Sequence, residues 1–381
     1  MIKIVYFYES FIHRGGTERI LIEKMNWLSD YGFEVIALTS EQGSHSFSFD
    51  LSANVKHIDL NVRFFTLYQY SVFFRFFKMW RMKRLLQRKF NDFIKEHSPD
   101  IVICTTYIAT YLSVMVDCPL SFKKVAESHI DKRFLINNDY LNRKSLLHLW
   151  KSKWELKMTE KLVRHFDLLV TLNPTDANDW APFVKTKIIT NTVHQNDTGK
   201  ISNGSSKHAI FVGRYTEQKG LDDLLAIWGL VHKFHSDWHL DLYGDGEKRD
   251  ELFAQAERMH ANIHIHMSTA NIFEKYVDSS IFLIASHYEP FGLVLPEAMS
   301  CGLPVVAFEA DGPCKIITDG VDGFLIENRN IKKFADCVCQ LIENKSLRLK
   351  MGQAGILSAQ QYSRNQIMPQ WKELFESLVN L

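Results

Sequence analysis

The chain has 381 residues, of which 46% are hydrophobic and 23% charged, and its formal net charge is +1. This length suits two domains that each bury a core, the composition is that of a soluble globular protein, and the near-neutral charge gives no indication of nucleic-acid binding. The sequence shows neither a signal peptide at its start nor the roughly 18 uncharged apolar residues of a membrane span, so the cytoplasm is the expected compartment.

The first half of the chain alternates short apolar strands with helices, which is typical of a parallel sheet with right-handed crossovers. A strand is predicted at 2–7. A helix is predicted at 18–31, because its apolar residues recur at helical spacing and Gly32 can end it. Further strands are predicted at 33–39, 101–104, 124–126 and 168–171.

A polar stretch rich in Gly and Ser at 193–207 is the best linker candidate, and the alternating pattern restarts after it. Strands are predicted there at 209–212, 239–243, 263–266, 281–285 and 304–308, with helices at 221–234 and 250–260. The expected fold class is therefore α/β, with Rossmann-like domains at 1–192 and 208–362 that face each other across a cleft. The C-terminal helix, within 363–381, is expected to pack back on the first domain.

The first candidate site is Gly15-Gly16, between the first strand and the helix that follows it. Glycines at this place let backbone amides approach a ligand closely, and the partial positive charge of a helix N-terminus suits a phosphate. A plain strand-to-helix turn explains the two glycines equally well.

The second candidate site holds two cations, Arg214 and Lys219, between a predicted strand and the next helix. Arg214 can bind phosphate oxygens through two hydrogen bonds, whereas Lys219 acts as a point charge. A diphosphate leaving group needs such neutralisation, because bond cleavage places new charge on it. The alternative is a pair of solvated surface cations.

The third candidate site holds two carboxylates, Glu289 and Glu297. Glu289 follows the predicted strand at 281–285, and Pro296 fits the first turn of a helix that would carry Glu297 near its N-terminus. Carboxylates accept hydrogen bonds from sugar and ribose hydroxyls. The alternatives are stabilisation of the helix dipole by Glu297 and a solvated loop charge at Glu289.

The run from Glu289 through Glu297 to residue 307 closely resembles the Glu-x7-Glu segment of family 4 retaining glycosyltransferases, which have the GT-B fold. The resemblance covers nearly the whole chain. Further segments of that family occur here in the family's order, at 15–19, 127–129, 213–220, 242–247 and 311–325.

The resemblance implies a role for each candidate residue of the second half. Arg214 and Lys219 would bind the diphosphate of a nucleotide-sugar donor, and Glu297 would hold its ribose. The transferred sugar and the phosphate would be contacted by Glu289 and by the backbone of Phe291, Gly292 and Leu293.

In the first half, the resemblance implies that His129 lies near the transferred sugar and that Gly15 and Gly16 lie near the phosphates. A histidine buried in the core is the alternative for His129. The catalytic residues implied are thus His129 and Glu289.

The segment 311–313 resembles that of enzymes that use UDP-hexose or UDP-N-acetylhexosamine, so a UDP-sugar is the expected donor. No Asp-x-Asp occurs in the sequence, and the six cysteines have no Cys-x-x-Cys spacing. We therefore expect neither a metal ion nor a cofactor, because cationic side chains and helix ends neutralise the diphosphate. Donor stereochemistry is expected to be retained.

The segment 64–93 combines aromatic residues with cations, and no acid occurs between Asn61 and Asn91. At helical spacing, Arg81, Arg84 and Arg88 form one stripe, with Trp80 beside them. A second stripe is apolar and consists of Phe76, Met79, Met82, Leu86, Phe90 and Phe93.

This composition is that of a helix lying on an anionic membrane, whereas core packing is the alternative for the apolar stripe. The segment predicts peripheral attachment to the inner face of the cell membrane. It also predicts a lipid-linked glycan acceptor, as in the synthesis of capsule or O-antigen.

Two other functions compete with sugar transfer. A nucleotide-sugar epimerase shares the architecture, but the Gly15-Gly16 and His129 segments favour transfer. An inactive sugar-nucleotide-binding partner of a membrane assembly is disfavoured because Arg214 and Lys219 are present along with both glutamates. A dehydrogenase is improbable, because no Gly-x-Gly-x-x-Gly follows the first strand.

Overall fold

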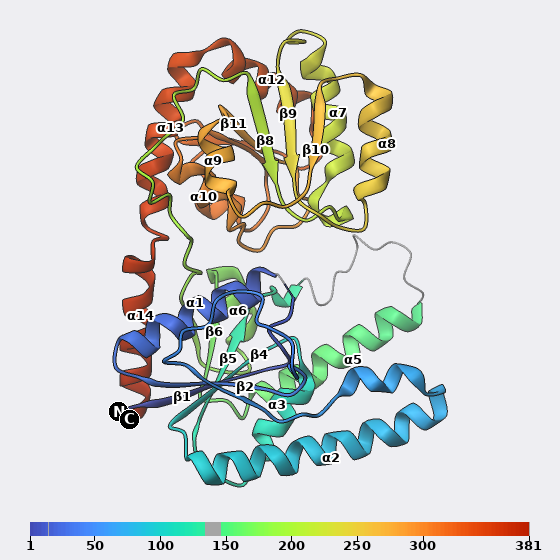
Figure 1. The fold of residues 1–381 in the computed structure, drawn as a ribbon, viewed down its shortest axis with the longest axis vertical. Coiled ribbons are helices and arrows are strands. Elements are labelled where there is room, and N and C mark those ends of the chain that lie inside the picture. The colour runs from blue at the N-terminus through green and yellow to red at the C-terminus, as the bar shows by residue number, and fades with distance from the viewer. Residues whose placement is uncertain (14, 134–145, 381) are drawn as a thin grey trace. The chain divides into compact units, whose positions relative to one another are not determined.

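The computed structural model describes residues 1–13, 15–133 and 146–380, and the chain forms two compact units (Figure 1). Unit 1 comprises Met1–Thr190 and Ile367–Leu381, and unit 2 comprises Asn191–Gln366. Each unit is a parallel sheet covered by helices, so the predicted pair of Rossmann-like α/β domains is confirmed.

Unit 1 is built on a seven-stranded sheet with the order β3-β2-β1-β4-β5-β6-β7. Its strands are β1 (Lys3–Tyr8), β2 (Glu34–Thr39), β3 (Lys56–Asp59), β4 (Ile101–Thr105), β5 (Lys123–Ser128), β6 (Leu168–Thr171) and β7 (Thr186–Ile188). The central strands are continuous apolar runs because helices cover both faces of a parallel sheet. Along β1, Val5 and Phe7 face one core cluster, whereas Ile4 and Tyr6 face the other.

The helices of unit 1 are α1 (Gly16–Asp30), η1 (Phe64–Gln69), α2 (Val72–His97), α3 (Ala109–Val116), α5 (Leu146–Val163), α6 (Pro174–Trp180) and α14 (Arg364–Val379). Residues of α2, α3 and α5 belong to the first cluster, and residues of α1 and α14 to the second. Trp371 and Phe375 of α14 are buried in that second cluster together with Trp27 of α1. The last helix of the chain is thus part of the core of unit 1.

Unit 2 is built on a six-stranded sheet with the order β10-β9-β8-β11-β12-β13. The strands are β8 (His208–Val212), β9 (His239–Tyr243), β10 (Ile263–His266), β11 (Ile281–Ile284), β12 (Val305–Phe308) and β13 (Gly323–Ile326). Its helices are η3 (Glu217–Lys219), α7 (Leu221–His232), α8 (Arg249–Met259), α9 (Ile272–Val277), α10 (Val294–Ser300), α11 (Pro313–Ile316), α12 (Ile331–Glu343) and α13 (Lys345–Gln360).

The predicted linker at 193–207 lies inside unit 2, and its backbone is hydrogen-bonded there. The amide of Val193 donates to the carbonyl of Tyr362 at 2.8 Å, and the amide of Ser202 donates to that of Cys301 at 2.8 Å. The polar composition of this stretch predicts a loop, but it does not show whether that loop packs against a domain. The chain passes between the units at 190–191 and again at 366–367.

Several elements are absent from the sequence prediction, and β3, β13 and α3 are examples. These three contain between four and eight residues each, which is too short for hydrophobic periodicity to identify them. Within the described residues, no helix combines the length and apolar character needed to cross a membrane.

Candidate active site

In unit 2, the loops that follow β8 and β11 meet at the carboxyl end of the sheet. Lys219 closes the short helix η3 after β8, and Glu289 lies in the loop after β11. The Nζ atom of Lys219 lies 2.5 Å from Oε2 of Glu289, and their side chains are only 13% and 8% exposed. The structure therefore joins two of the predicted site residues in a largely buried ion pair.

Backbone contacts set the position of this ion pair. The amide of His287 donates to the carbonyl of Gln218 at 3.0 Å, and Nε2 of Gln218 donates to the carbonyl of Tyr288 at 3.0 Å. Gly220 has a φ of +60°, and a Cβ there would lie 1.9 Å from the carbonyl oxygen of Ala285. Only glycine lets the two loops approach this closely, so Lys219 is directed at Glu289 by the main chain.

Glu297 lies on α10 and is 4% exposed, with the hydroxyl of Tyr276 at 3.5 Å from its Oε2. Pro296 stands in the first turn of that helix, as predicted. The amide of Gly312 donates to the carbonyl of Glu289 at 2.7 Å, and a Cβ on Gly312 would lie 2.2 Å from the carbonyl oxygen of Phe291. The segment 311–313 is thereby packed directly on the loop that carries Glu289.

The backbone from Phe291 to Leu293 leads from that loop into α10, where Leu293 is the N-cap residue. Gly292 adopts a φ of +86°. Phe291 is buried against the ring of Tyr362, with ring centroids 5.5 Å apart. These three predicted donor-contacting residues thus lie next to Glu289 in one ordered turn.

Arg214 lies exposed in the loop between β8 and η3. Its neighbour Tyr215 is fully buried, and the hydroxyl oxygen of Tyr215 lies 2.7 Å from each of the carbonyl oxygens of Leu242 and His266, to which its one proton can donate. The backbone beside Arg214 is therefore anchored while the guanidinium stays open to solvent. The structure pairs Lys219 with Glu289 and leaves Arg214 outside that ion pair.

In unit 1, a second buried network surrounds His129, which follows β5. Nε2 of His129 lies 3.0 Å from Oε2 of Glu127, and Nζ of Lys24 on α1 lies 2.6 Å from the same oxygen. All three residues are at most 9% exposed. The sequence indicated His129 and the segment around it as part of the site. It did not indicate Lys24, because Lys24 occupies a position of α1 that faces the core.

Lys24 is enclosed by α14, since its Nζ lies 3.5 Å from the centroid of the Trp371 ring, a cation–π contact. Burial lowers the pKa of Lys24, and Glu127 offsets part of this effect. Burial also opposes ionisation of Glu127, but the charge of Lys24 and the hydrogen bonds with His129 and Lys24 outweigh it and hold the pKa of Glu127 below its ordinary value. Glu127 is therefore a buried carboxylate that stays ionised.

Two buried oxygen atoms of this region are unsatisfied. Within the described parts of the chain, Oε1 of Glu127 and the hydroxyl of Tyr6 have no hydrogen-bond partner. A buried polar atom without a partner costs free energy, so such atoms are often where a ligand or a water binds. The network around His129 can therefore accept a further donor.

Gly15 and Gly16 lie at the start of α1, with Gly15 as the N-cap residue. No side chain caps this helix N-terminus. The carboxylate of Glu18 in its first turn accepts a hydrogen bond from Tyr8 at 3.0 Å, and burial raises the pKa of Tyr8. Both glycines thus occupy the predicted place between β1 and α1.

The predicted basic and aromatic segment forms η1 and α2. Leu86, Phe90 and Phe93 are buried in a core cluster of unit 1, so the core alternative is correct for this part of the stripe. The side chain of Phe76 lies outside the described set.

Several large apolar residues of the segment are instead solvent-exposed, namely Phe65, Tyr68, Phe74, Phe77 and Trp80. Arg81, Arg84 and Arg88 are also exposed, and the guanidinium of Arg84 lies 3.6 Å from the Trp80 ring centroid.

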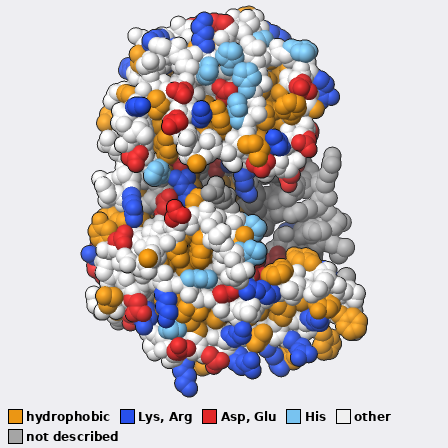
Figure 2. Space-filling model, viewed as in Figure 1, with side chains coloured by type: hydrophobic (Ala, Val, Ile, Leu, Met, Phe, Trp, Pro, Cys, Tyr) orange, Lys and Arg blue, Asp and Glu red, His pale blue; other side chains and the backbone are white. Residues whose placement is uncertain are grey.

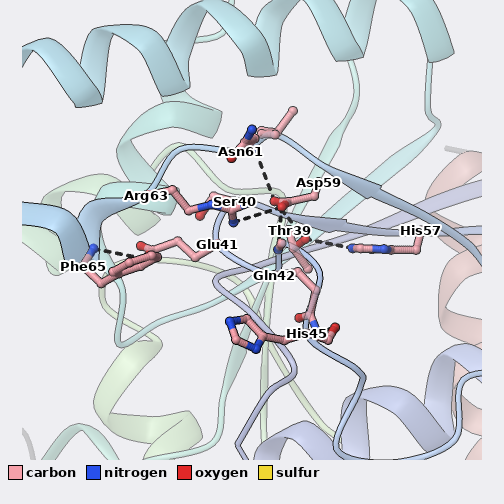
Figure 3. Close-up of polar contacts among 12 residues, drawn as sticks. Thr39, Ser40, Glu41, Gln42, His45, His57, Asp59, Asn61, Arg63 and Phe65 are labelled. Atoms are coloured by element: carbon pink, nitrogen blue, oxygen red, sulfur yellow. Dashed lines mark hydrogen bonds and ion pairs between the residues drawn. The ribbon is translucent and has the colours of Figure 1, made fainter.

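Polar contacts tie the start of this segment to the ends of β2 and β3 (Figure 3). Glu41 accepts a hydrogen bond from the amide of Phe65 at 3.2 Å, and Arg63 pairs with Asp59 at 3.0 Å. Burial opposes ionisation of Asp59, but hydrogen bonds from the amides of Gly43 and Asn61, together with Arg63, lower its pKa overall. The start of the segment that carries the exposed aromatic residues is therefore held against the ends of β2 and β3.

Known proteins resemble this chain in sequence and in fold. The model of the family Glycosyl transferases group 1 matches residues 195–357. AmsD, an amylovoran biosynthesis glycosyltransferase of Erwinia amylovora, is 25% identical over 395 residues, covering 98% of this chain and 99% of that protein. An uncharacterized glycosyltransferase of Haemophilus influenzae is 26% identical over 378 residues, with the same two coverages of 98% and 99%.

The same fold occurs in solved structures. TarM of S. aureus matches with a TM-score of 0.77 at 16% identity, covering 98% of this chain and all of that one. Sucrose-phosphate synthase of Thermosynechococcus elongatus matches with a TM-score of 0.80 at 15% identity, covering 99% of each chain. Residues 195–357 of unit 2 thus match the glycosyl transferases group 1 model, and nearly the whole chain is similar in sequence to glycosyltransferases.

The buried network of unit 1 makes a prediction about stability. Glu127→Gln leaves the ammonium of Lys24 in the interior without a countercharge, so we expect a loss of about 3–5 kcal/mol in the free energy of unfolding, measured with urea. The double variant Lys24→Met, Glu127→Gln should recover much of this loss. Glu23→Gln breaks the more exposed Arg19–Glu23 pair and should cost less than about 1 kcal/mol. Equal losses for Glu127→Gln and Glu23→Gln would contradict this account.

Proposed function

We propose that this chain is a family 4 glycosyltransferase that moves a hexose or an N-acetylhexosamine from a UDP-sugar to a lipid-linked glycan acceptor. The observation that carries the proposal is the Lys219–Glu289 ion pair, held by the backbone at the carboxyl ends of β8 and β11 in the domain that the family model matches. Glu297 is buried on the helix that follows.

The ion pair suits a diphosphate. Lys219 is largely removed from water, where a positive charge attracts an anion more strongly than it does at an exposed site. Arg214 is exposed in the same loop and can bind phosphate oxygens through two hydrogen bonds. A UDP donor is further supported by similar folds, because TarM and HepE of Anabaena were each solved in complex with UDP.

Glu289 has a positioning role in this proposal. Its carboxylate holds Lys219 in place before the donor binds, and the diphosphate then shares or takes over that cation. A carboxylate engaged in a short ion pair is a poor nucleophile. We therefore propose that the acceptor attacks on the same face from which the diphosphate departs, and that the donor's anomeric configuration is retained.

Stereochemistry can be measured directly. We expect proton NMR of the product to show the same anomeric configuration as the donor sugar. The control is the spectrum of the donor under the same conditions, which establishes that the anomeric centre does not change without enzyme. An inverted centre would exclude the same-face mechanism and the family 4 assignment.

The phosphate site is tested with purified protein and a panel of UDP-, GDP- and ADP-sugars, in which hydrolysis of a UDP-sugar should be fastest. Lys219→Ala and Arg214→Ala should each lower turnover by roughly a hundredfold, because each removes one preorganised charge contact with the leaving group. Arg214 is exposed, so its loss should leave the melting temperature unchanged.

The matched control is Lys207→Ala, which removes an exposed cation of unit 2 that pairs with exposed Asp237. We expect this variant to keep wild-type turnover. Activity should persist in EDTA, since we propose that Lys219 and Arg214 neutralise the diphosphate without a metal ion. A strict need for Mn²⁺ or Mg²⁺ would refute this part of the proposal.

The exposed face of η1 and α2 supports a membrane-bound acceptor. Its aromatic residues can enter the interface of a bilayer, and each cation near an anionic surface contributes about 1 kcal/mol. The relative AmsD is named for amylovoran biosynthesis, and LpsE of Rhizobium meliloti is named for lipopolysaccharide core biosynthesis. We therefore propose peripheral attachment to the cytoplasmic leaflet.

Co-sedimentation with lipid vesicles tests this attachment. The wild type should bind vesicles that contain anionic lipid, ignore neutral ones, and be released by salt, because the attraction is electrostatic. The triple variant Arg81→Glu, Arg84→Glu, Arg88→Glu should lose binding. The matched triple variant Lys207→Glu, Lys233→Glu, Lys350→Glu changes the same charge on unit 2 and should keep it. If the wild type ignores anionic vesicles at low salt, a soluble acceptor is the better hypothesis.

A further inference from the structure

One face of the sheet in unit 2 carries a row of histidines that the proposed sugar transfer does not use. His208 lies on β8, His239 and Asp241 on β9, and His264 and His266 on β10. Residues two apart on a strand share a face, and the register places Asp241 beside His264 and His208 beside His239. Figure 2 shows histidine side chains gathered over these strands in unit 2.

Three of these side chains converge on one point. Oδ1 of Asp241 lies 3.3 Å from Nδ1 of His264 and 2.9 Å from Nε2 of His266. Each of the three residues offers one potential ligand atom, and these atoms all lie within 4.8 Å of one another. The Asp241 side chain is 11% exposed, whereas those of His264 and His266 are 51% and 38% exposed, so the group is open to solvent on one side.

We propose that Asp241, His264 and His266 bind a divalent transition-metal ion of the Zn²⁺ class. Around a tetrahedral zinc, ligand atoms at about 2.0–2.1 Å from the metal lie about 3.3 Å from one another. The Asp241–His264 distance already has this value, and the Asp241–His266 distance must widen by only a few tenths of an ångström. Two imidazoles and one carboxylate suit Zn²⁺, Ni²⁺ or Cu²⁺, whereas Mg²⁺ and Ca²⁺ take oxygen ligands.

The neighbouring side chains hold the three ligands in orientation. Nδ1 of His208 lies 3.4 Å from Oδ2 of Asp241, whereas His264 and His266 contact the other carboxylate oxygen, Oδ1. The His266 ring stacks on Tyr243, with centroids 4.5 Å apart and an interplanar angle of 13°. The His264 ring lies 5.4 Å from that of His239 at 26°. Such outer contacts set the direction of metal ligands and thus their affinity.

The site differs from the donor site in its residues and in its chemistry. Three protein ligands leave a fourth tetrahedral position for water or for another ligand, and β10 is the edge strand of the sheet. The simpler alternative is a set of His–Asp hydrogen bonds on an exposed sheet face. This alternative predicts no specific affinity for a metal ion.

Calorimetric titration of the untagged, metal-free chain with zinc chloride separates the two accounts. The wild type should bind one equivalent of Zn²⁺ and gain thermal stability from it. His264→Ala, His266→Ala and Asp241→Asn should each weaken Zn²⁺ binding by at least about tenfold. His165→Ala and Cys314→Ser remove an exposed histidine and an exposed thiol elsewhere, and both should bind Zn²⁺ as the wild type does.

Folding is checked by the melting temperature without metal, which His264→Ala should leave near the wild-type value because that side chain is half exposed. Hydrolysis of the sugar donor should also be unchanged in this variant, so failure of the metal site and failure of the proposed transfer are distinguishable. Absence of Zn²⁺ binding in the wild type would overturn the proposal, as would binding that survives in the double variant His264→Ala, His266→Ala.

Discussion

The Lys219–Glu289 ion pair is the interaction around which the candidate site of unit 2 is arranged. Taking both charges out of water costs free energy, which their mutual attraction repays only when the geometry is good. The geometry is set by the main chain, because Gly220 lets η3 lie against the end of β11. In the function that we propose, a cation held in this way loses little freedom when a diphosphate binds to it. The close packing of 311–313 on the Glu289 loop extends the same constraint to the rest of the site.

Unit 1 also contains a buried ion pair between a lysine and a glutamate. Lys24 and Glu127 form a pair that is more deeply buried than the one in unit 2, and His129 shares the same carboxylate oxygen. Trp371 of α14 covers the ammonium of Lys24, so the last helix of the chain encloses the network. The ionised state of Glu127 fixes the position of His129, whereas Oε1 of Glu127 remains available to a further donor.

The helix α2 has large apolar residues of two kinds, some buried in the core and others exposed to solvent. Leu86 and Phe90 are fully buried in the core of unit 1, while Phe77 and Trp80, nearer the start of the helix, are exposed. An amphipathic helix divides its residues in this way when only part of its length reaches the core. Core packing therefore accounts for the buried residues of this helix, whereas membrane contact by its exposed residues stays a proposal.

The sequence by itself determined the two α/β halves, the positions of most of their strands along the chain, and the loops that carry Arg214, Lys219 and Glu289. Hydrophobic periodicity and loop glycines are local patterns, so they can be recognised in the sequence alone. Contacts between residues that lie far apart in the chain were shown only by the tertiary structure. Lys24 with Glu127, and Asp241 with His264 and His266, meet because neighbouring strands and helices set their register. The placement of 193–207 within unit 2 depended likewise on hydrogen bonds to residues more than a hundred positions away, which composition does not record.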